Sequence, residues 1–359
     1  MKFSCDAIGA FAKRAFMHVG VPEEDAAQAA AVIAQAERSG VNSHGLQRLP
    51  MYMNRLLDGA VNMHPDLKMT SLVPGCMAFD GDNGLGIVNG PRVLDIVIER
   101  AKELGIAAAT LNHSNHYGAG NYYGWKLAKA GLIGICMTNT SPCMAPTGGS
   151  ESLLGSNPLT VAFPARNHDP VVLDMATSTV SLGKLQVMAG AGKEAPLGWV
   201  LDSEGKPSTD PAAPLKGGSM VPVGGYKGYG LALIIDLFSA VLSGACYGRD
   251  IGRLGVPGSK QPEGIGHFFL AVDPARFLPE DEYYQRMENY IDMIKNSRLA
   301  PGVAQIWMPG EIEFNNARRI EAEGAEVPPA TAQRVVQCCI RCGMAAEGVT
   351  LEELIHGDV

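Results

Sequence analysis

The sequence predicts an α+β fold in which helices from both ends of the chain form one lobe beside a central α+β domain. Three observations predict it. The first sixty residues repeat apolar side chains at a helical period, the stretch from about residue 74 to about residue 309 alternates glycine-rich turns with short apolar runs, and the last stretch is helical again. We therefore expect residues 1–73 with 312–359 to form the helical lobe and residues 74–311 to form the α+β domain.

Three helices are expected in the N-terminal stretch. Apolar residues from Ile8 to Phe16 keep a 3.6-residue rhythm that ends at Gly20. Pro22 opens a second helix, which has an acidic first turn and runs to Gly40. A third helix is expected at about 46–57, so the segment 42–48 lies at a junction between two helices.

Strands and helices alternate in the central stretch. Strands are expected at 106–111, 132–138, 160–163, 171–175, 267–272 and 304–308. One helix is expected at 91–104, capped by Gly105, and a buried one at 228–242. Near the C-terminus, Thr350 and Glu353 form a capping-box pattern that predicts a last short helix.

Composition narrows the class of protein. With 359 residues, 46% of them hydrophobic and 18% charged, the chain can bury a substantial core. A net charge of −8 without a basic run argues against a nucleic-acid partner. No run reaches the roughly 18 apolar residues of a membrane span, and the N-terminus lacks the apolar region of a signal peptide. Together with eight cysteines expected to be free thiols, this predicts a cytoplasmic protein without a membrane partner.

Two histidines stand in glycine-flanked segments that interrupt the regular patterns. His44 lies in NSHGLQR and His116 in HSNHYG, where a titratable group is beside residues that allow close approach of a ligand. Arg48, four residues after His44, is of the type best shaped to hold a carboxylate through two hydrogen bonds. A proton-transfer residue beside a carboxylate clamp indicates chemistry on a small organic acid. His113 and His267 are expected to orient or pack, as most single histidines do.

Four further segments are suited to line a cavity: 139–149, 173–178 with Gly183 and Lys184, 224–230, and 309–311. They follow strands or begin helices, and such places hold ligands in α/β-type proteins. Lys227 stands among small and aromatic residues before a helix, which favours contact with a phosphate or ribose.

Common nucleotide and hydrolase motifs are absent from the sequence. It contains no G-x-x-x-x-G-K-[ST], no G-x-S-x-G and no H-E-x-x-H. The glycine-rich segment 81–86 has the wrong spacing for a Rossmann fingerprint, and no strong strand is expected before it. A dinucleotide that binds here would therefore bind to a different fold.

A metal site is not expected. Cys338 and Cys342 share a helix face, but no second Cys or His pair at zinc-site spacing accompanies them, so they are expected to be buried thiols. The histidines 44, 113 and 116 leave a metal-dependent hydrolase or lyase open as an alternative. No carboxylate at a supporting spacing completes such a site.

Seven motifs occur in order along the chain: SHGxxRxxxY, HSNHYGAGNYY, NTSPxxAPxGG, LGSNPLTVAFP, LDMATSxxxxGK, KGYGLALxxD and GHFFLAVDP. Through them the chain resembles, over about residues 36–311, the malate/L-lactate dehydrogenase family of NAD(P)-dependent oxidoreductases. That family includes ureidoglycolate dehydrogenase, sulfolactate dehydrogenase, 2,3-diketogulonate reductase and Δ1-piperideine-2-carboxylate reductase. The resemblance implies a homodimer with a helical lobe and a non-Rossmann, cofactor-binding α+β domain.

The resemblance also implies roles for individual residues. His116 and His44 match acid/base histidines, and Ser43, Arg48 and Tyr52 match contacts to the substrate. Cofactor contacts are implied for Thr140, Asp174, Met175, Ala176, Lys227, Pro309, Gly310 and Glu311. Relatives often have Asp where this chain has Asn42 and Arg where it has Ser39, so the preferred substrate does not carry over from any one relative.

Together these features predict an enzyme that interconverts a small 2-hydroxy acid, such as malate, lactate or sulfolactate, and its 2-oxo acid by hydride transfer. The expected cofactor is NAD or NADP, with NAD favoured because no basic cluster stands near the cofactor segments. A reductase of a cyclic imino acid or diketo acid is the alternative within the same fold.

Overall fold

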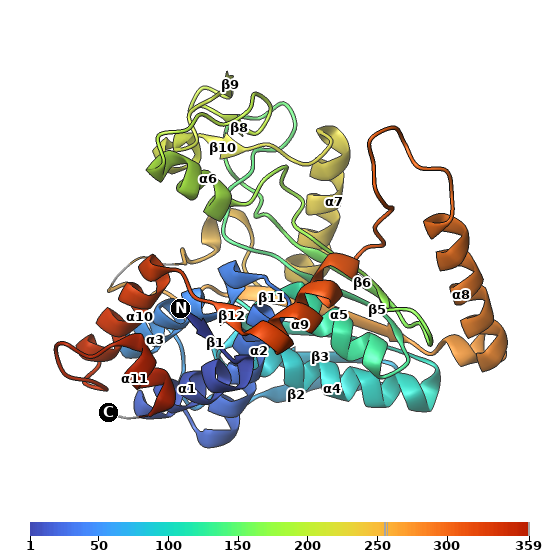
Figure 1. Ribbon diagram of the computed structural model, residues 1–359, viewed down its shortest axis with the longest axis horizontal. Helices are drawn as coiled ribbons and strands as arrows, with labels where there is room; N and C mark the ends of the chain where they lie inside the picture. Colours follow the sequence, from blue (N-terminus) through green and yellow to red (C-terminus); the bar gives the residue numbers. More distant parts are fainter. Residues whose placement is uncertain (255, 257, 358–359) are drawn as a thin grey trace.

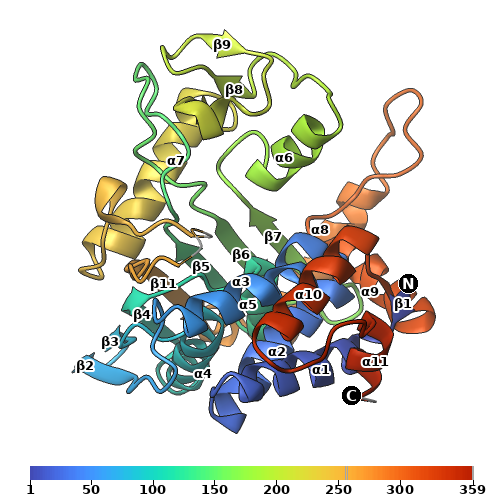
Figure 2. The same cartoon turned by 90° about the vertical axis from the view of Figure 1, so that its left-hand side faces the viewer.

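The computed structural model describes residues 1–254, 256 and 258–357, and it confirms the α+β class. Figures 1 and 2 show a central sheet with helices packed on it, a cluster of helices from both chain ends on one side, and a smaller part that projects on the other. The central sheet has the strand order β2-β3-β4-β11-β5-β6-β7. The strands in that order are β2 (Lys68–Val73), β3 (Cys76–Asp80), β4 (Ile106–Ser114), β11 (Ile265–Val272), β5 (Ile133–Thr138), β6 (Leu159–Phe163) and β7 (Val171–Met175).

The direction of the strands brings three distant segments to one edge of this sheet. β11 lies antiparallel between β4 and β5, with His267 opposite Leu111 on one side and Thr138 on the other. β6 is antiparallel to both β5 and β7. The carboxyl ends of β4, β5 and β7 therefore lie at the same edge, together with the start of β11.

Two helices connect the strands and cover the sheet. α4 (Gly86–Leu104) links the parallel strands β3 and β4, and α5 (Gly120–Lys129) links β4 to β5. Their apolar faces are buried against the sheet in one core, in which Val93 and Leu127 from the helices and Phe269 from β11 are fully buried. This packing fixes α5 so that its N-terminus points at the edge described above.

The helical lobe joins the two ends of the chain. Its helices are α1 (Cys5–His18), α2 (Glu23–Arg38), α3 (Leu49–Leu57), α9 (Glu311–Glu323), α10 (Pro329–Arg341) and α11 (Leu351–His356). Phe11, Phe16 and Ile33 share one buried core with Val335 and Leu354. β1 (Lys2–Phe3) pairs antiparallel with β12 (Ala325–Glu326), so the first residues of the chain are hydrogen-bonded to a strand near its C-terminal end. Figures 1 and 2 both show α1 beside α11.

The projecting part contains a short sheet and two helices. The short sheet has the order β10 (Ser219–Met220), β8 (Val200–Leu201), β9 (Pro207–Ser208), and α6 (Leu182–Gly190) lies beside it. α7 (Tyr226–Asp236) runs from this part toward the main sheet and continues as a π-helical turn, Leu237–Val241. α8 (Glu280–Lys295) stands apart from the other helices, at the right-hand side of Figure 1.

Most predicted elements are confirmed. The first two helices and the Thr350–Glu353 capping box form as expected. The predicted helix 91–104 is α4, which begins earlier, at Gly86, and contains Pro91. The predicted helix 46–57 begins with a 3-10 turn, and the predicted helix 228–242 is α7 with its π-helical extension. The expectation that this helix is buried is wrong, because only one side of it packs on the protein and Ile234 and Val241 are 49% and 58% exposed.

Two further predictions are wrong. Residues 304–308 form no strand, because this mostly exposed segment has no ladder partner among the described residues. A strand does precede the glycine-rich segment 81–86, namely β3, whose alternating burial is too short to stand out in the sequence. Among the described residues, no helix has both the length and the apolar composition to cross a membrane.

Because the helical lobe depends on one shared core, a cavity in α1 should destabilise the whole lobe. Phe11 is fully buried, and Phe11→Ala should lower the free energy of unfolding by about 3–5 kcal/mol, measured by urea denaturation followed by circular dichroism. Met17→Ala, on the same helix at a position that is 42% exposed, is the matched control and should change stability by less than about 0.5 kcal/mol. Equal effects of the two variants would contradict the described packing.

Candidate active site

Two histidines lie side by side near the edge where the three strands end. His44 ends the 3-10 turn Asn42–His44 between α2 and α3, and His116 lies in the loop between β4 and α5. Their rings are stacked, with centroids 5.4 Å apart and planes inclined by 18°. The structure thus brings together the two residues on which the sequence-based prediction depends, from segments about seventy residues apart.

A buried carboxyl group shapes the turn that carries His44. Glu37, at the end of α2, is 3% exposed, and its Oε1 accepts a 2.7 Å hydrogen bond from the backbone N–H of Leu46. A Cβ atom at position 45 would lie 2.1 Å from that oxygen, so only glycine fits there. The glycine after His44 is therefore required by close packing.

Hydroxyl groups hold the Nδ1 atoms of both rings. Tyr52 Oη lies 2.7 Å from His116 Nδ1, and Ser43 Oγ lies 2.9 Å from His44 Nδ1. Within the described part of the chain, the Nε2 atom of neither ring has a hydrogen-bond partner. Such a ring is oriented at one nitrogen and able to exchange a proton with a ligand at the other.

Both histidines are held in the neutral form. Burial lowers the pKa of His44 to about 4, and the charge of Arg48 lowers it further in the same direction. Burial also lowers the pKa of His116 well below its ordinary value, with smaller contributions from His44, Arg48 and His267. A neutral imidazole at physiological pH can accept a proton, which is what a general base must do.

Arg48 supplies positive charge beside the histidines. It ends the 3-10 turn Leu46–Arg48 ahead of α3, is half-buried, and donates a 2.8 Å hydrogen bond from Nε to the carbonyl of Ser43. Tyr52 follows one turn later and is 2% exposed. The Ser43, His44, Arg48 and Tyr52 side chains therefore form one cluster with His116, as the spacing SHGxxRxxxY predicts.

The predicted cofactor residues Thr140, Asp174, Met175 and Ala176 lie at the same sheet edge, just after or at the ends of β5 and β7. Asp174 is accessible to solvent yet crowded by protein atoms, as on the wall of a cleft, and it accepts a 2.7 Å hydrogen bond from the backbone N–H of Asn121 at the start of α5. Crowding raises the pKa of its carboxyl group to about 6.

The other predicted cofactor residues lie in two further segments, the turn at the start of α9 and the first turn of α7. Pro309 accepts a hydrogen bond from Val172 in β7, and Gly310 adopts a left-handed φ of +88° that begins α9. The carboxylate of Glu311 bonds to Lys295 and to the N–H of Met308, so it closes this turn with internal contacts. Lys227 is exposed in the first turn of α7.

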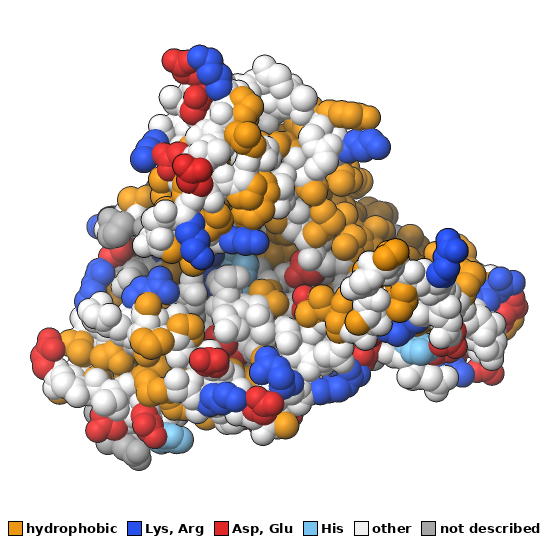
Figure 3. Space-filling view, turned by 45° about the horizontal axis from the view of Figure 1, so that its top comes forward, with side chains coloured by type: hydrophobic (Ala, Val, Ile, Leu, Met, Phe, Trp, Pro, Cys, Tyr) orange, Lys and Arg blue, Asp and Glu red, His pale blue; other side chains and the backbone are white. Residues whose placement is uncertain are grey.

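Figure 3 shows a hollow between the projecting part and the helical lobe. A histidine side chain lies in it, and Lys and Arg side chains lie along its edge. In a chain with a net charge of −8, this local positive charge would attract an anionic ligand into the hollow.

Polar residues that were not predicted from the sequence lie behind His116. Glu263, in the loop before β11, is 2% exposed and accepts a 2.8 Å hydrogen bond from the backbone N–H of His116. The Asn115 side chain donates to Asn83 and Gly84 and accepts from Arg55 in α3. Asn115 could have been selected because it precedes His116 in the HSNH segment. Glu263 gave no such signal, since nothing in its local sequence shows that it reaches His116.

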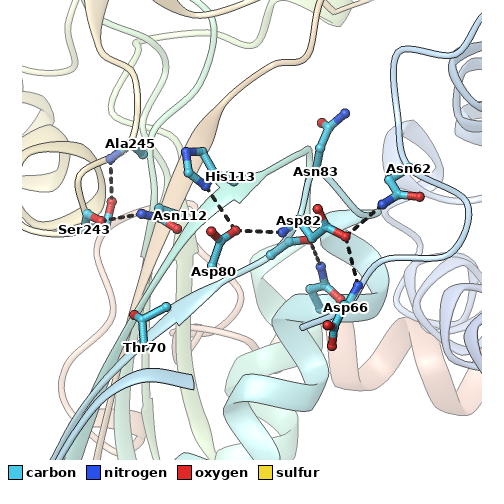
Figure 4. A network of polar contacts seen from close by, with 12 residues as sticks. Asn62, Asp66, Thr70, Asp80, Asp82, Asn83, Asn112, His113, Ser243 and Ala245 are labelled. Carbon is cyan, nitrogen blue, oxygen red and sulfur yellow. Dashed lines mark hydrogen bonds and ion pairs between the residues drawn. The ribbon is translucent and has the colours of Figure 1, made fainter. Parts of the chain in front are cut away.

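The remaining histidines do not join the pair. His113, whose φ is +42°, is exposed, and its Nδ1 lies 3.0 Å from Asp80 in a network with Asp82 and Asn62 (Figure 4). His267 is fully buried between Thr138 and Ser114, as expected of a core residue. Among the described residues, no three His, Cys, Asp or Glu side chains are grouped to hold a metal ion. Cys338 is a buried thiol as expected, whereas Cys342, at the end of α10, is only half-buried.

A separate cavity of about 550 Å³ lies at the other end of α5. It is lined by Trp125 stacked on Phe314 and by Arg166 over the ring of Tyr284. The stacked, neutral histidines and Arg48 offer acid–base chemistry that these side chains lack, so the candidate active site is the histidine cluster.

Comparison with known proteins shows the family of this chain. The family model described as malate/L-lactate dehydrogenase matches residues 3–336. The malate dehydrogenase of Pyrococcus horikoshii is 40% identical over 316 residues, which cover 86% of this chain and 86% of that protein. The Δ1-pyrroline-2-carboxylate/Δ1-piperideine-2-carboxylate reductase of Pseudomonas putida is 31% identical, over 87% of this chain and 89% of that protein. The solved structure of sulfolactate dehydrogenase from Methanocaldococcus jannaschii superposes with a TM-score of 0.89 at 34% identity, covering 98% of this chain and 99% of that chain.

The electrostatics of the histidine pair predict its titration. In an NMR titration of the ring C–H signals, assigned with a His116→Gln variant, His116 should stay neutral down to a pH well below 6.5 because burial disfavours its cationic form. His44→Gln removes a group that lowers the pKa of His116, so the His116 titration should move to higher pH. A wild-type His116 that protonates at pH 6.5 or above would contradict the described burial.

Proposed function

This chain belongs to the malate/L-lactate dehydrogenase family and is an oxidoreductase that uses a nicotinamide cofactor, and from that premise we propose that it interconverts a small 2-hydroxy acid and its 2-oxo acid. The observation that carries the proposal is the stacked, neutral pair His44–His116 beside Arg48. The pair lies where the proposed helical lobe, 1–73 with 312–359, meets the proposed α+β domain, 74–311.

His116 is the proposed acid/base. In the oxidative direction its Nε2 accepts the proton of the substrate hydroxyl while Tyr52 holds Nδ1. A nicotinamide held by the residues at the sheet edge would supply the hydride acceptor for C2 in this direction. His44, stacked on His116, polarises the same oxygen or relays the proton. In the reductive direction His116 returns the proton to the oxygen of the 2-oxo acid.

Arg48 is the proposed clamp for the substrate carboxylate. A guanidinium group offers two parallel N–H donors to a carboxylate, and Ser43 and Tyr52 flank it. Holding the carboxylate fixes which face of C2 is turned to the nicotinamide, and this orientation accounts for much of the catalytic effect.

The residues at the sheet edge fit a dinucleotide. Lys227 in the first turn of α7 is suited to the pyrophosphate, because cations and helix N-termini both attract phosphate. The Thr140 hydroxyl and the backbone of Met175 and Ala176 offer hydrogen bonds, and the accessible carboxylate of Asp174 suits a ribose hydroxyl. We propose NAD over NADP, because a carboxylate at this position would repel a 2′-phosphate.

Reduction of a cyclic imino acid is the second candidate, favoured by the 31% identity to the Pseudomonas putida reductase. His116 would then give its proton to the ring nitrogen. An absorbance assay of NADH and NADPH with a panel of 2-oxo acids and cyclic imino acids separates the candidates. Oxidation of NADH with a 2-oxo acid is expected, and activity with imino acids alone would select the second candidate.

We further propose that the enzyme is a cytoplasmic homodimer in which a second copy covers α7. This helix is apolar on nearly all sides, yet Ile234, Leu237 and Val241 on it and its π-helical extension are 49%, 43% and 58% exposed. A helix that is apolar all round is normally buried on every side, and contiguous exposed apolar surface marks an interaction site.

Loss of the acid/base group should reduce turnover without loss of binding. His116→Gln should lower kcat about 10²–10⁴-fold, since that is the usual contribution of general acid–base catalysis, while the Kd for NADH measured by fluorescence stays within about twofold. His64→Gln, a substitution at an exposed histidine outside the cluster, is the control and should keep wild-type kcat. Near-normal turnover by His116→Gln would assign the proton transfer to another residue.

Arg48→Gln should instead act on substrate binding. Losing a charge-assisted contact of about 1.5–3 kcal/mol should raise KM for the 2-oxo acid roughly 10- to 100-fold. Arg100→Gln, at a surface position paired with Glu103, is the control. An unchanged KM in Arg48→Gln would exclude Arg48 as the clamp.

The homodimer is tested by mass. Light scattering should give twice the chain mass of 37.9 kDa, and the double variant Ile234→Glu, Val241→Glu should give the mass of a single chain, because the charges oppose burial of α7. Met293→Glu, at a 61% exposed position on α8, is the control and should remain dimeric. A wild-type protein of single-chain mass would refute the homodimer.

A further inference from the structure

Glu263 is a buried carboxyl group whose side chain is fixed against the candidate catalytic loop. It is 2% exposed, and its Oε2 accepts the hydrogen bond from the backbone N–H of His116 at 2.8 Å. No Lys, Arg or His side chain of the described residues lies within ion-pair distance of it. A buried carboxylate without a direct partner is costly, so its charge depends strongly on the groups that surround it.

The groups that face Glu263 come mainly from α3 and the turn before it. Arg55 is 6% exposed, and it reaches Asn115 Oδ1 at 3.2 Å and the carbonyl of Gln261 at 3.3 Å. Asn115 Oδ1 also lies 3.4 Å from the backbone N of Glu263, so one amide joins the two segments. The Nε and Nη1 atoms of Arg55 have no hydrogen-bond partner among the described residues.

Glu263 therefore shares a cationic neighbourhood with the proposed substrate clamp. The charges of Arg55 and Arg48 both favour the ionised form of Glu263. In turn, the charge of Glu263 raises the pKa of the hydroxyl of Tyr52, which lies in α3 with Arg55. Burial dominates, and it raises the pKa of Glu263 to about 7 in spite of the two guanidinium groups and the His116 amide. Near neutral pH the carboxyl group is thus divided between its charged and neutral forms.

We propose that Glu263 is a positioning residue that controls affinity for the substrate carboxylate by setting how much of the positive charge of Arg48 and Arg55 is offered to it. This inference rests on the proposed function, in which Arg48 holds the substrate. When Glu263 is ionised, it competes with the substrate for the field of the two arginines. When Glu263 is neutral, that field acts on the substrate alone.

The direction of the pH effect follows. The ionised fraction of Glu263 grows as the pH rises through about 7, so affinity for an anionic substrate falls over the same interval. Conversely, a bound carboxylate makes ionisation of Glu263 less favourable, so binding is accompanied by proton uptake. The 2-oxo acid itself is fully ionised throughout this interval, and its own titration does not contribute.

The test measures KM for the 2-oxo acid between pH 6 and pH 8.5 in wild type, Glu263→Gln and Glu288→Gln. Gln at 263 can still accept the His116 hydrogen bond but carries no charge. Wild-type KM should rise up to about tenfold across the interval, as expected if bound substrate shifts the Glu263 pKa by about one unit. Glu263→Gln should have a low KM that does not vary with pH, whereas a purely structural role would raise KM at every pH.

Glu288→Gln is the matched control, because Glu288 is also buried and accepts hydrogen bonds from backbone N–H groups, those of Arg166 and Asn167, but lies outside the candidate site. It should keep the wild-type pH dependence. A pH-dependent KM in Glu263→Gln, or a flat one in Glu288→Gln, would overturn the inference while leaving the proposed function intact.

A second measurement needs no variant. For wild type, KM for a neutral ester of the same 2-oxo acid should not change over this interval, because an uncharged group does not compete with Glu263. A parallel rise of KM for acid and ester would refute the inference even if Glu263→Gln does not fold. If no 2-oxo acid is turned over by wild type, the proposed function itself fails.

Discussion

The placement of β11 between β4 and β5 determines the rest of the site. Because β11 is antiparallel to both neighbours, the carboxyl ends of β4 and β5 point the same way, and β6 then returns β7 to that direction. The loop that carries His116, the segment at Thr140 and the end of β7 at Asp174 consequently share an edge. The same strand delivers Glu263, just before its first residue, to the amide of His116. These strand pairings thus bring together residues that are up to 147 positions apart.

Burial then gives these residues their chemical character. The helical lobe closes over the edge with α2 and α3, and it removes His44 and His116 from water far enough to keep both rings neutral. The same closure leaves Glu37 and Glu263 as carboxyl groups that are readily protonated. The site therefore combines neutral bases with fixed guanidinium groups, an arrangement that suits a negatively charged substrate and a proton that must be moved.

The local features of the site were predictable, and the long-range ones were not. The segments NSHGLQR and HSNHYG can be recognised in the sequence because each places histidine close to glycine, and the first also contains arginine. His44, Arg48 and His116 could therefore be selected from sequence. Glu263 could not, because its contact with His116 spans 147 positions and leaves no local pattern. The apolar run 304–308 resembles a strand in sequence, but a strand also needs a hydrogen-bonding neighbour, and only the fold decides whether one is present. The strand β2 was not predicted, although it has a hydrogen-bonding neighbour in β3. Its residues are largely exposed, so they lack the apolar pattern of a buried strand.

The shared core of the helical lobe has a consequence for biosynthesis. Phe3 pairs with Ala325, so α1 and α2 leave the ribosome long before the helices that cover them. At about 5–20 residues per second, translation supplies those partners about 15–65 s later. During that time the apolar faces of α1 and α2 have no native partner from the C-terminal segment, and the lobe can close only after nearly the entire chain has been made. For most of the synthesis of the chain these apolar faces are therefore open to non-native contacts, which is the condition under which aggregation competes with folding.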